Sequence, residues 1–477
     1  MRLRMGRVLS VASECVPLLK TGGLADVVGA LPGALAGQGW DMRVLMPAYR
    51  PLRAQLAGWD EVWSEPDLFG GAGRVFVGSV GGISVLLLDA PHLYDREGGP
   101  YAGPHGDWHD NDIRFAALSW AGAAIAREGL ADGWRPDVLH AHDWQAGFAP
   151  AYLAYSGVNL PSVMTIHNIA FQGFAPVSQL YALRLPPEQY YPDALEYFGG
   201  ISSLKAGLIT AHKITTVSPT YAGELGRAEF GMGLQGVINA RAADVTGILN
   251  GVDTDVWSPE TGENPFSAGA PQGKAKARAA LCAEFGLDVP GPLAIVVSRL
   301  TDQKGIDLIP QVAEKFIAAG GGLAILGNGD PALEAQMHQL AARFPGRVSV
   351  RIGYDEALSQ RMFAGGDAVL VPSRFEPCGL TQMYGLHFGT LPVVAAVGGL
   401  ADTVITANPA ALAAGVATGI TFHPTDAAAF GLALQNLITL HADQKTWAKM
   451  IDNAMHHPVG WDNSAARYAA LYSGLMA

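Results

Sequence analysis

Segment 20–26, which reads KTGGLAD, joins a flexible cation to a pair of glycines. Paired glycines let a backbone approach a ligand closely and leave successive amides free to bind an anion. A helix is predicted to begin near Leu24, and the dipole at its N-terminus would add positive potential. Lys20, Gly22 and Gly23 are therefore candidates for binding a phosphate or a developing oxyanion. The alternative is a strand–turn–helix joint that carries a surface lysine.

Two cations follow a predicted strand in the second half of the chain. Arg299 and Lys304 lie in segment 298–305, which reads SRLTDQKG. In α/β folds, ligands bind at the carboxyl ends of strands. Two cations on such a loop can bind a diphosphate without a metal. The same spacing also suits two unrelated surface cations.

A carboxylate and a cysteine follow another predicted strand, in segment 372–381 with the sequence PSRFEPCGLT. Glu376 can bind sugar hydroxyls there, and the alternative is that it caps the helix that follows. Cys378 is either a ligand contact or a packed side chain. Three successive amides are expected to open this helix onto a phosphate, those of Gly379, Leu380 and Thr381.

Histidines and polar residues end two predicted strands of the first half. His140, His142 and Asp143 end one strand, and His167 with Asn168 ends the next. Histidine is the commonest transition-metal ligand, so a metal site is one interpretation. We expect the HAH spacing to place the first two histidines on opposite faces of their strand, which argues against a shared metal. Hydrogen bonding to sugar hydroxyls and packing in the core are the favoured interpretations.

Glycines recur in two other segments. GGLAD is repeated at 398–402, again between a predicted strand and a helical segment, so two halves could face one ligand; chance or packing also produces such a match. Gly327 and Gly329 with Ala332 fit a variant of the dinucleotide-binding fingerprint, but we favour a simple strand-to-helix turn. The P-loop pattern is absent from the sequence.

The composition is that of a globular protein with an excess of acidic over basic residues. Hydrophobic residues make up 49% of the 477 residues and charged residues 16%, which supplies packed cores and argues against disorder. The net charge of -12 argues against nucleic-acid partners. The three cysteines form no CxxC pair, which predicts neither a zinc site nor a disulfide framework and favours a reducing, cytoplasmic location. No apolar stretch is long enough to span a bilayer, so no membrane partner is expected, and the oligomeric state is left open.

The candidate residues follow predicted strands, so β-sheets must position them. The sequence predicts two such sheets. Short β-branched apolar runs alternate with longer segments rich in alanine and leucine, and the runs are continuous, as in strands buried on both faces of a parallel sheet. Predicted strands are 8–13, 43–47, 83–89, 137–140, 162–167, 213–217, 247–250, 293–298, 322–326, 348–352, 368–372, 392–395 and 420–422. Predicted helices are 274–285, 304–318, 331–343, 356–364, 427–441 and 464–475.

This alternation predicts a doubly wound α/β architecture. Turn-forming residues concentrate at 256–290, which we interpret as the boundary between two halves. The sequence therefore predicts two Rossmann-like domains facing a central cleft.

Ten segments together resemble the bacterial glycogen synthases and plant starch synthases of glycosyltransferase family 5. They are 20–27, 90–95, 140–144, 165–168, 217–221, 248–253, 298–301, 303–305, 372–381 and 398–402, in the family's order along nearly the whole chain. The resemblance implies the GT-B fold. It implies an acceptor-side domain at 1–255, a nucleotide-sugar-binding domain at 256–455, and a final helix within 456–477 that crosses back to the first domain.

The activity implied by the resemblance is transfer of glucose from ADP-glucose to the non-reducing end of an α-1,4-glucan. The anomeric configuration is retained, and neither a metal nor another cofactor is expected. In the second domain, Glu376 would bind glucose hydroxyls and Tyr354 would stack on adenine. Arg299 and Lys304 would neutralise the departing ADP, which agrees with the electrostatics of two cations near helix N-termini.

In the first domain, the resemblance implies that Lys20 and the turn at Gly22 and Gly23 contact the donor or its phosphates. The backbone carbonyl of His167 would steady positive charge on the transferred glucose. Asp143 and Asn168 would lie nearby.

One position departs from related GT-B enzymes, many of which carry a second acidic residue eight positions after the first to bind ribose. Here that position is Tyr384, and synthases of this family commonly lack the second acid. Three other functions stay open: a glycosyltransferase with a different sugar, a catalytically silent glucan-binding protein, and an NAD-dependent dehydrogenase based on the turn at Gly327. Front-face attack and a covalent intermediate are both open as routes to retention.

Overall fold

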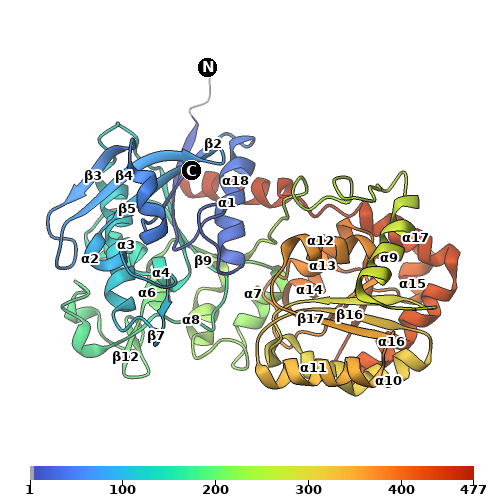
Figure 1. Cartoon of the computed structure of the whole chain (residues 1–477). Helices are drawn as coiled ribbons and strands as arrows, with labels where there is room; N and C mark the ends of the chain where they lie inside the picture. Colours follow the sequence, from blue (N-terminus) through green and yellow to red (C-terminus); the bar gives the residue numbers. More distant parts are fainter. Residues whose placement is uncertain (1–4) are drawn as a thin grey trace. The chain divides into compact units, whose positions relative to one another are not determined.

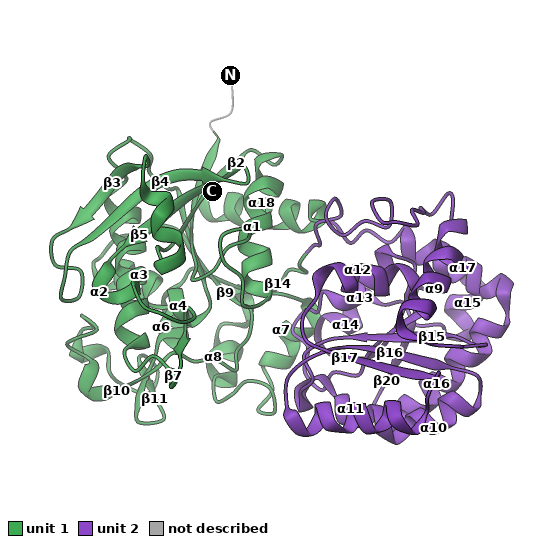
Figure 2. Ribbon diagram, in the orientation of Figure 1, with its two compact units in different colours: residues 1–250, 461–477 green, residues 251–460 purple. Residues whose placement is uncertain are grey.

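The structure is a computed structural model that describes residues 5–477 and divides into two compact units, coloured separately in Figure 2. Unit 1 comprises residues 1–250 and 461–477, and unit 2 comprises residues 251–460. The sequence-based boundaries lie after residues 255 and 455, whereas the contacts divide the chain after residues 250 and 460.

Unit 1 is built on a nine-stranded sheet with the order β14-β13-β9-β8-β1-β2-β5-β4-β3. The strands from β14 to β5 run parallel. Their bounds are β1 Gly6–Val11, β2 Trp40–Pro47, β5 Ile83–Asp89, β8 Val138–His142, β9 Ser162–Ile166, β13 Lys213–Thr216 and β14 Val245–Gly247. Most of their residues are buried, because helices cover both faces of a doubly wound sheet. The first six correspond to predicted strands, whereas β14 shares only Gly247 with the predicted strand 247–250, which was placed too far along the chain.

Two antiparallel strands extend this sheet and were not predicted. They are β3 (Asp60–Glu65) and β4 (Gly73–Val80), and β4 pairs antiparallel with both β3 and β5. Both are partly exposed, so they lack the continuous apolar runs by which the parallel strands are recognised.

The final helix belongs to the core of unit 1. Helix α18 (Asp462–Met476) lies beside α1 (Gly23–Ala36) in Figure 1. Its residues Tyr468 and Tyr472 are buried in one cluster with Val8 of β1. The chain's last helix therefore stabilises the sheet from which the chain began.

Unit 2 contains a parallel sheet with the order β17-β16-β15-β18-β19-β20. This is the strand order 3-2-1-4-5-6 of a Rossmann sheet. The strands are β15 Leu293–Val297, β16 Gly322–Gly327, β17 Val348–Ile352, β18 Ala368–Val371, β19 Leu391–Ala395 and β20 Ile420–Phe422. Its helices include α9 Gln272–Phe285, α10 Ile309–Ala318, α11 Pro331–Arg343, α12 Glu356–Gly365, α13 Thr381–His387, α14 Gly398–Thr403 and α16 Ala427–Ala442.

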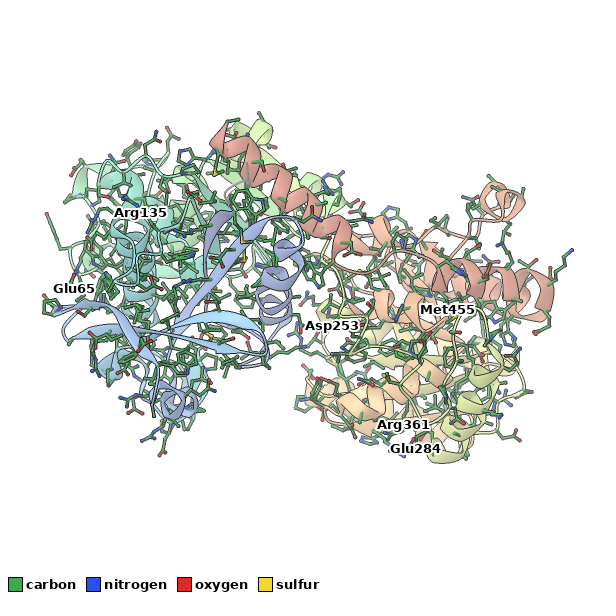
Figure 3. All side chains as sticks on the ribbon, turned by 90° about the horizontal axis from the view of Figure 1, so that it is seen from above. Glu65, Arg135, Asp253, Glu284, Arg361 and Met455 are labelled. Carbon is green, nitrogen blue, oxygen red and sulfur yellow. The ribbon has the colours of Figure 1, made fainter. Side chains whose placement is uncertain are left out.

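An ion pair connects helices α9 and α12 beside this sheet. Glu284 of α9 accepts hydrogen bonds from Arg361 of α12 at 2.9 and 3.0 Å, and Figure 3 shows the two side chains together. Among residues 5–477, no helix is long and apolar enough to cross a membrane.

The predicted helix at 304–318 is wrong over its first residues. The regular helix α10 begins only at Ile309, and two short 3-10 turns precede it, Asp302–Lys304 and Ile306–Leu308. Gly305 separates these turns in a left-handed conformation with φ +66°, which an L side chain rarely adopts. Lys304 therefore ends a short 3-10 turn rather than lying in the regular helix.

Candidate active site

A pocket opens in unit 2 at the carboxyl ends of two neighbouring strands, β15 and β18. The strand order reverses between them, and α/β folds bind ligands at such a switch point. The lining residues are Val297, Ser298, Lys304, Ile306, Leu370, Val371, Pro372, Ser373, Glu376 and Thr381. The pocket thus brings together three of the predicted site residues, Lys304, Glu376 and Thr381.

The ammonium group of Lys304 contacts the carboxylate of Glu376 in this pocket. Lys304 Nζ lies 2.5 Å from Glu376 Oε2, and the hydroxyl of Ser373 donates to the same oxygen at 3.0 Å. The side chain of Glu376 is 9% exposed and that of Lys304 is 19% exposed. No described residue donates to the other carboxylate oxygen, Oε1, so this oxygen is available to a ligand hydroxyl. The pair thus offers one acceptor and one cation at the same place.

Close backbone packing explains how Lys304 reaches Glu376. A Cβ atom on Gly305 would lie 1.9 Å from the carbonyl oxygen of Pro372, so only glycine lets the two loops meet. The side-chain amide of Gln303 donates from Nε2 to the carbonyl of Phe375 at 3.1 Å. The loops that follow β15 and β18 are therefore joined at the site itself.

An ion pair between Arg374 and Asp307 also joins the loops that follow β15 and β18. Arg374 donates to both carboxylate oxygens of Asp307 at 2.6 and 2.7 Å, a two-pronged geometry that fixes orientation. Hydrogen bonds from this guanidinium lower the pKa of Asp307 below its ordinary value. Both residues are charged near neutral pH, and the loops stay linked.

The second GGLAD segment supports the Glu376 loop from behind. A Cβ on Gly398 would lie 1.9 Å from the carbonyl oxygen of Glu376, and one on Gly399 would lie 2.3 Å from that of Cys378. The amide of Gly399 donates to the carbonyl of Glu376 at 3.2 Å. These glycines are buried against protein backbone, so their role in the structure is close packing.

The glycines of the first copy have a different environment. A Cβ on Gly22 or Gly23 would meet no atom within 4 Å, so this turn is open. The two copies of the repeat therefore differ physically: the glycines of one pack against the protein's own backbone, and those of the other have open space beside them.

The remaining glycine pattern, at 327–329, is explained by packing. A Cβ on Gly327 would lie 1.9 Å from the carbonyl oxygen of Ser298, and one on Gly329 would lie 2.3 Å from that of Leu300. Both glycines serve the close approach of the turn after β16 to the loop after β15. The turn has the structural explanation that the sequence analysis favoured over a dinucleotide site.

Other predicted residues of unit 2 lie around the pocket or apart from it. Arg299 is exposed, and no described residue forms an ion pair with it. Tyr354 follows the edge strand β17, is 75% exposed, and donates from its hydroxyl to Glu356 at 2.9 Å. Cys378 is buried. At the position of the missing second acid, Tyr384 stacks on Trp257 with ring centroids 3.9 Å apart.

The turn before α13 presents backbone amides beside the pocket. Among residues 5–477 we find no acceptor for the N–H groups of Gly379, Leu380 and Thr381. Gly379 has φ +75°, which suits glycine and turns the chain sharply after Cys378. These amides are therefore available to an anionic or hydroxyl ligand.

In unit 1, a buried acid that sequence analysis missed holds the glycine loop. Glu14 follows β1, is 3% exposed, and accepts hydrogen bonds from the amide and hydroxyl of Thr21 and from the amide of Gly22. The hydroxyl of Tyr101 donates to it as well. Lys20 on the same loop pairs with Asp26 at 2.7 Å. Glu14 thus fixes the loop that carries Lys20 and Gly22.

Asp143 joins the ends of β8 and β9. Its Oδ1 accepts from the amide of His167 at 2.7 Å and from that of Asn168 at 3.3 Å. The backbone of Asp143 has φ +52°, a left-handed conformation that is strained for most residues other than glycine. Burial raises the pKa of Asp143 to about 7, although its two amide hydrogen bonds favour the carboxylate. A buried carboxyl with a shifted pKa at a strand end is typical of a functional site.

The prediction that His140 and His142 point to opposite faces is wrong. Side chains two residues apart in a strand share a face, and the two rings lie 4.1 Å apart between centroids. His142 Nδ1 lies 2.9 Å from His167 Nε2. Burial lowers the pKa of His140 and of His167 to about 3, and that of His142 well below its ordinary value. All three are therefore neutral at pH 7.

Of the predicted residues of unit 1, Asp143, His167 and Asn168 meet in one place, whereas Lys20, Gly22 and Gly23 occupy the separate loop after β1. Among residues 5–477, no group of three or more His, Cys, Asp or Glu side chains is arranged to hold a metal ion. The rule that ligands gather at strand ends could have identified Glu14, which follows β1 directly.

Comparisons with known proteins extend these observations. Residues 7–240 match the family described as starch synthase catalytic domain, and residues 279–457 match glycosyl transferases group 1. A glycogen synthase of Cereibacter sphaeroides is 71% identical over the full length of both chains. A glycogen synthase of Paracoccus denitrificans is 59% identical over 99% of this chain and 100% of its own length.

A solved structure agrees in fold over nearly the whole chain. The catalytic domain of starch synthase IV from Arabidopsis thaliana, bound to ADP and acarbose, gives a TM-score of 0.87 with 30% identity, covering 99% of both chains. The sucrose-phosphate synthase of Thermosynechococcus elongatus, at 19% identity and a TM-score of 0.59, shares the fold alone. The fold is GT-B, as predicted.

Proposed function

The chain belongs to the family of bacterial glycogen synthases and plant starch synthases, and we propose on that premise how its residues carry out the family's glucosyl transfer. The enzyme transfers glucose from ADP-glucose to the non-reducing end of an α-1,4-glucan and so elongates glycogen. The bond between the glucose C1 and the phosphate oxygen breaks, and its electron pair leaves with ADP. The 4-hydroxyl oxygen of the glucan bonds to C1 and releases its proton.

The Lys304–Glu376 pair is the observation that carries this assignment. The free oxygen of Glu376 accepts from hydroxyls of the donor glucose, and Lys304 lies beside it to neutralise the phosphate that departs. Such preorganised charge acts where charge develops and commonly supplies the largest share of catalysis. Arg299, with no ion-pair partner among the described residues, adds a second cation on the same loop.

Backbone groups complete the donor site of unit 2. We assign the amides of Gly379, Leu380 and Thr381 to the phosphates, with Cys378 packed beneath the turn. Tyr354 stacks on adenine, which its exposure permits.

In unit 1, Asp143 aims a backbone carbonyl at the reacting sugar. The amide of Asn168 shares a planar trans peptide with the carbonyl of His167, so the two groups point in opposite directions. Because that amide donates to Asp143, the carbonyl of His167 faces away from it and is free to steady positive charge at C1. Lys20 and the open turn at Gly22 and Gly23 supply further positive potential to the phosphates.

We also propose that turnover needs no metal, since these cations and amides can balance the charge on ADP. A cytoplasmic location is proposed as well, supported by cysteines that form no disulfide in the described chain. The test is incorporation of labelled glucose into glycogen with excess EDTA, from ADP-glucose and, in parallel, from UDP-glucose. Elongation from ADP-glucose is expected. Elongation that needs an added divalent ion would overturn the metal-free part, and elongation only from another nucleotide sugar would overturn the donor assignment.

A further inference from the structure

Two buried polar residues, Ser10 and His142, connect to the ring of His167 by hydrogen bonds, and neither has a role in the proposed glucosyl transfer. Ser10 of β1 and His142 of β8 are both fully buried. Ser10 Oγ lies 3.1 Å from His142 Nε2, and His142 Nδ1 lies 2.9 Å from His167 Nε2. The three residues thus form a chain of hydrogen bonds that ends on a predicted catalytic residue.

The neutral imidazoles of His142 and His167 each carry one proton. The ring nitrogen that holds it follows from which partner must donate in each hydrogen bond. No other described residue hydrogen-bonds the Ser10 hydroxyl, and a buried O–H without an acceptor is unfavourable. Ser10 must therefore donate to His142 Nε2. His142 then has its proton on Nδ1 and donates it to His167 Nε2.

This order leaves a single arrangement for His167. Its Nε2 accepts, so its own proton is on Nδ1. No described residue hydrogen-bonds Nδ1 of His167, and the side chain is only slightly exposed. The ring therefore offers an N–H donor to whatever molecule binds beside it.

We propose that Ser10 and His142 are positioning residues that hold His167 in the Nδ1–H tautomer, so that its side chain donates a hydrogen bond to an oxygen of the bound sugar. The role of that donor rests on the proposed glucosyl transfer. The tautomer itself rests only on the hydrogen bonds within unit 1.

A neighbouring chain of hydrogen bonds supplies a matched control. The hydroxyl of Tyr472, on α18, lies 2.7 Å from His140 Nδ1, and His140 Nε2 lies 2.5 Å from Thr165 Oγ1. This chain is equally buried and packs against the first, since the rings of His140 and His142 are 4.1 Å apart. It forms no hydrogen bond with His167, so Tyr472→Phe disturbs packing without changing the tautomer.

Substitutions at His142 can separate the effect of the donor's position from the effect of replacing the imidazole ring. The amide nitrogen of an asparagine lies near the place of Nδ1, whereas that of a glutamine lies near the place of Nε2. His142→Asn can therefore still donate to His167, and His142→Gln cannot. Both variants carry the same amide, so a difference between them reports on the proton that His167 receives.

The experiment is a long-range 1H–15N spectrum of histidine-labelled full-length protein, which distinguishes the two tautomers directly. We expect His167 as Nδ1–H in the wild type, His142→Asn and Tyr472→Phe, and mixed tautomers in Ser10→Ala and His142→Gln. In kcat/KM for ADP-glucose we expect about tenfold losses in the last two variants. His142→Asn should stay within about threefold of wild type, and thermal unfolding verifies folding of each variant.

An Nε2–H tautomer of His167 in the wild type would overturn the proposal. So would an unchanged Nδ1–H spectrum in both Ser10→Ala and His142→Gln. A wild-type protein without glucosyl transfer but with the Nδ1–H tautomer would refute the proposed function and leave the positioning by Ser10 and His142 intact.

Discussion

Glu376 Oε2 accepts from Lys304 at 2.5 Å, although the two residues follow different strands of the unit 2 sheet. The contact exists because β15 and β18 are neighbours at the point where the strand order reverses. One charged pair thus joins the loops that follow these two neighbouring strands.

Because these two residues act as a unit, their substitutions should not be additive. We expect Lys304→Met and Glu376→Gln each to lower kcat/KM for ADP-glucose by about 10²–10³, and the double variant to lose little more. Steady-state rates of glucan elongation measure this, with Lys445→Met at an exposed position as the control for loss of a lysine. Losses that simply multiply in the double variant would show that the residues act separately.

The two GGLAD copies should respond oppositely to alanine. In Gly398→Ala the new Cβ would overlap the carbonyl oxygen of Glu376, at a backbone φ of +43°, so we expect a loss of about 2–4 kcal/mol in the free energy of unfolding. In Gly23→Ala the Cβ meets open space, so stability should stay within about 0.5 kcal/mol while activity falls. Urea unfolding and initial rates separate the two effects. Equal destabilisation of both variants would refute the distinction.

Glu14 should control the glycine loop. Glu14→Gln replaces an acceptor-only carboxylate by an amide whose N–H₂ group faces the donors of Thr21, Gly22 or Tyr101. We expect a loss of about 1–3 kcal/mol in unfolding free energy and a larger KM for ADP-glucose. Asp67→Asn, at an exposed loop position, is the control for a neutralised acid. A KM unchanged from wild type would separate Glu14 from the donor site.

Asp143 should make the protein less stable as pH rises. Its pKa is raised in the folded state to about 7 from an ordinary value of 3.8, so between these values the folded chain binds more protons than the unfolded chain. Unfolding free energy therefore falls as pH rises from about 4 to 7 through this group.

Asparagine removes this effect and tolerates a positive φ. We expect Asp143→Asn to be more stable than wild type at pH 8, by up to about 4 kcal/mol, and equal to it near pH 4. Urea unfolding at both pH values measures the difference. A gain at pH 4 as large as that at pH 8 would contradict the shifted pKa.

The sequence predicted the parallel strands well, because residues buried on both faces form continuous apolar runs such as that of β1. It missed β3 and β4, whose partly exposed residues leave no such run. The start of α10 was also misplaced, since the left-handed turn at Gly305 depends on packing against Pro372.

The candidate site was predictable only where neighbours in sequence are neighbours in space. Lys304, Glu376 and Asp143 stand out because they follow strands. The partners of Glu14 include Tyr101, which is far away along the chain, so no local pattern reveals that contact. The shared face of His140 and His142 was legible from the two-residue period of a strand and was misjudged.

The most direct test of the account follows the product of one turnover by 1H NMR. Purified protein is mixed with ADP-glucose and maltotriose, and the anomeric proton of each newly attached glucose is monitored. We expect an α-1,4 signal to grow as the donor signal declines, with ADP released in equal amount. A β-configured product, or a donor signal that does not decline, would contradict retaining glucosyl transfer by this protein.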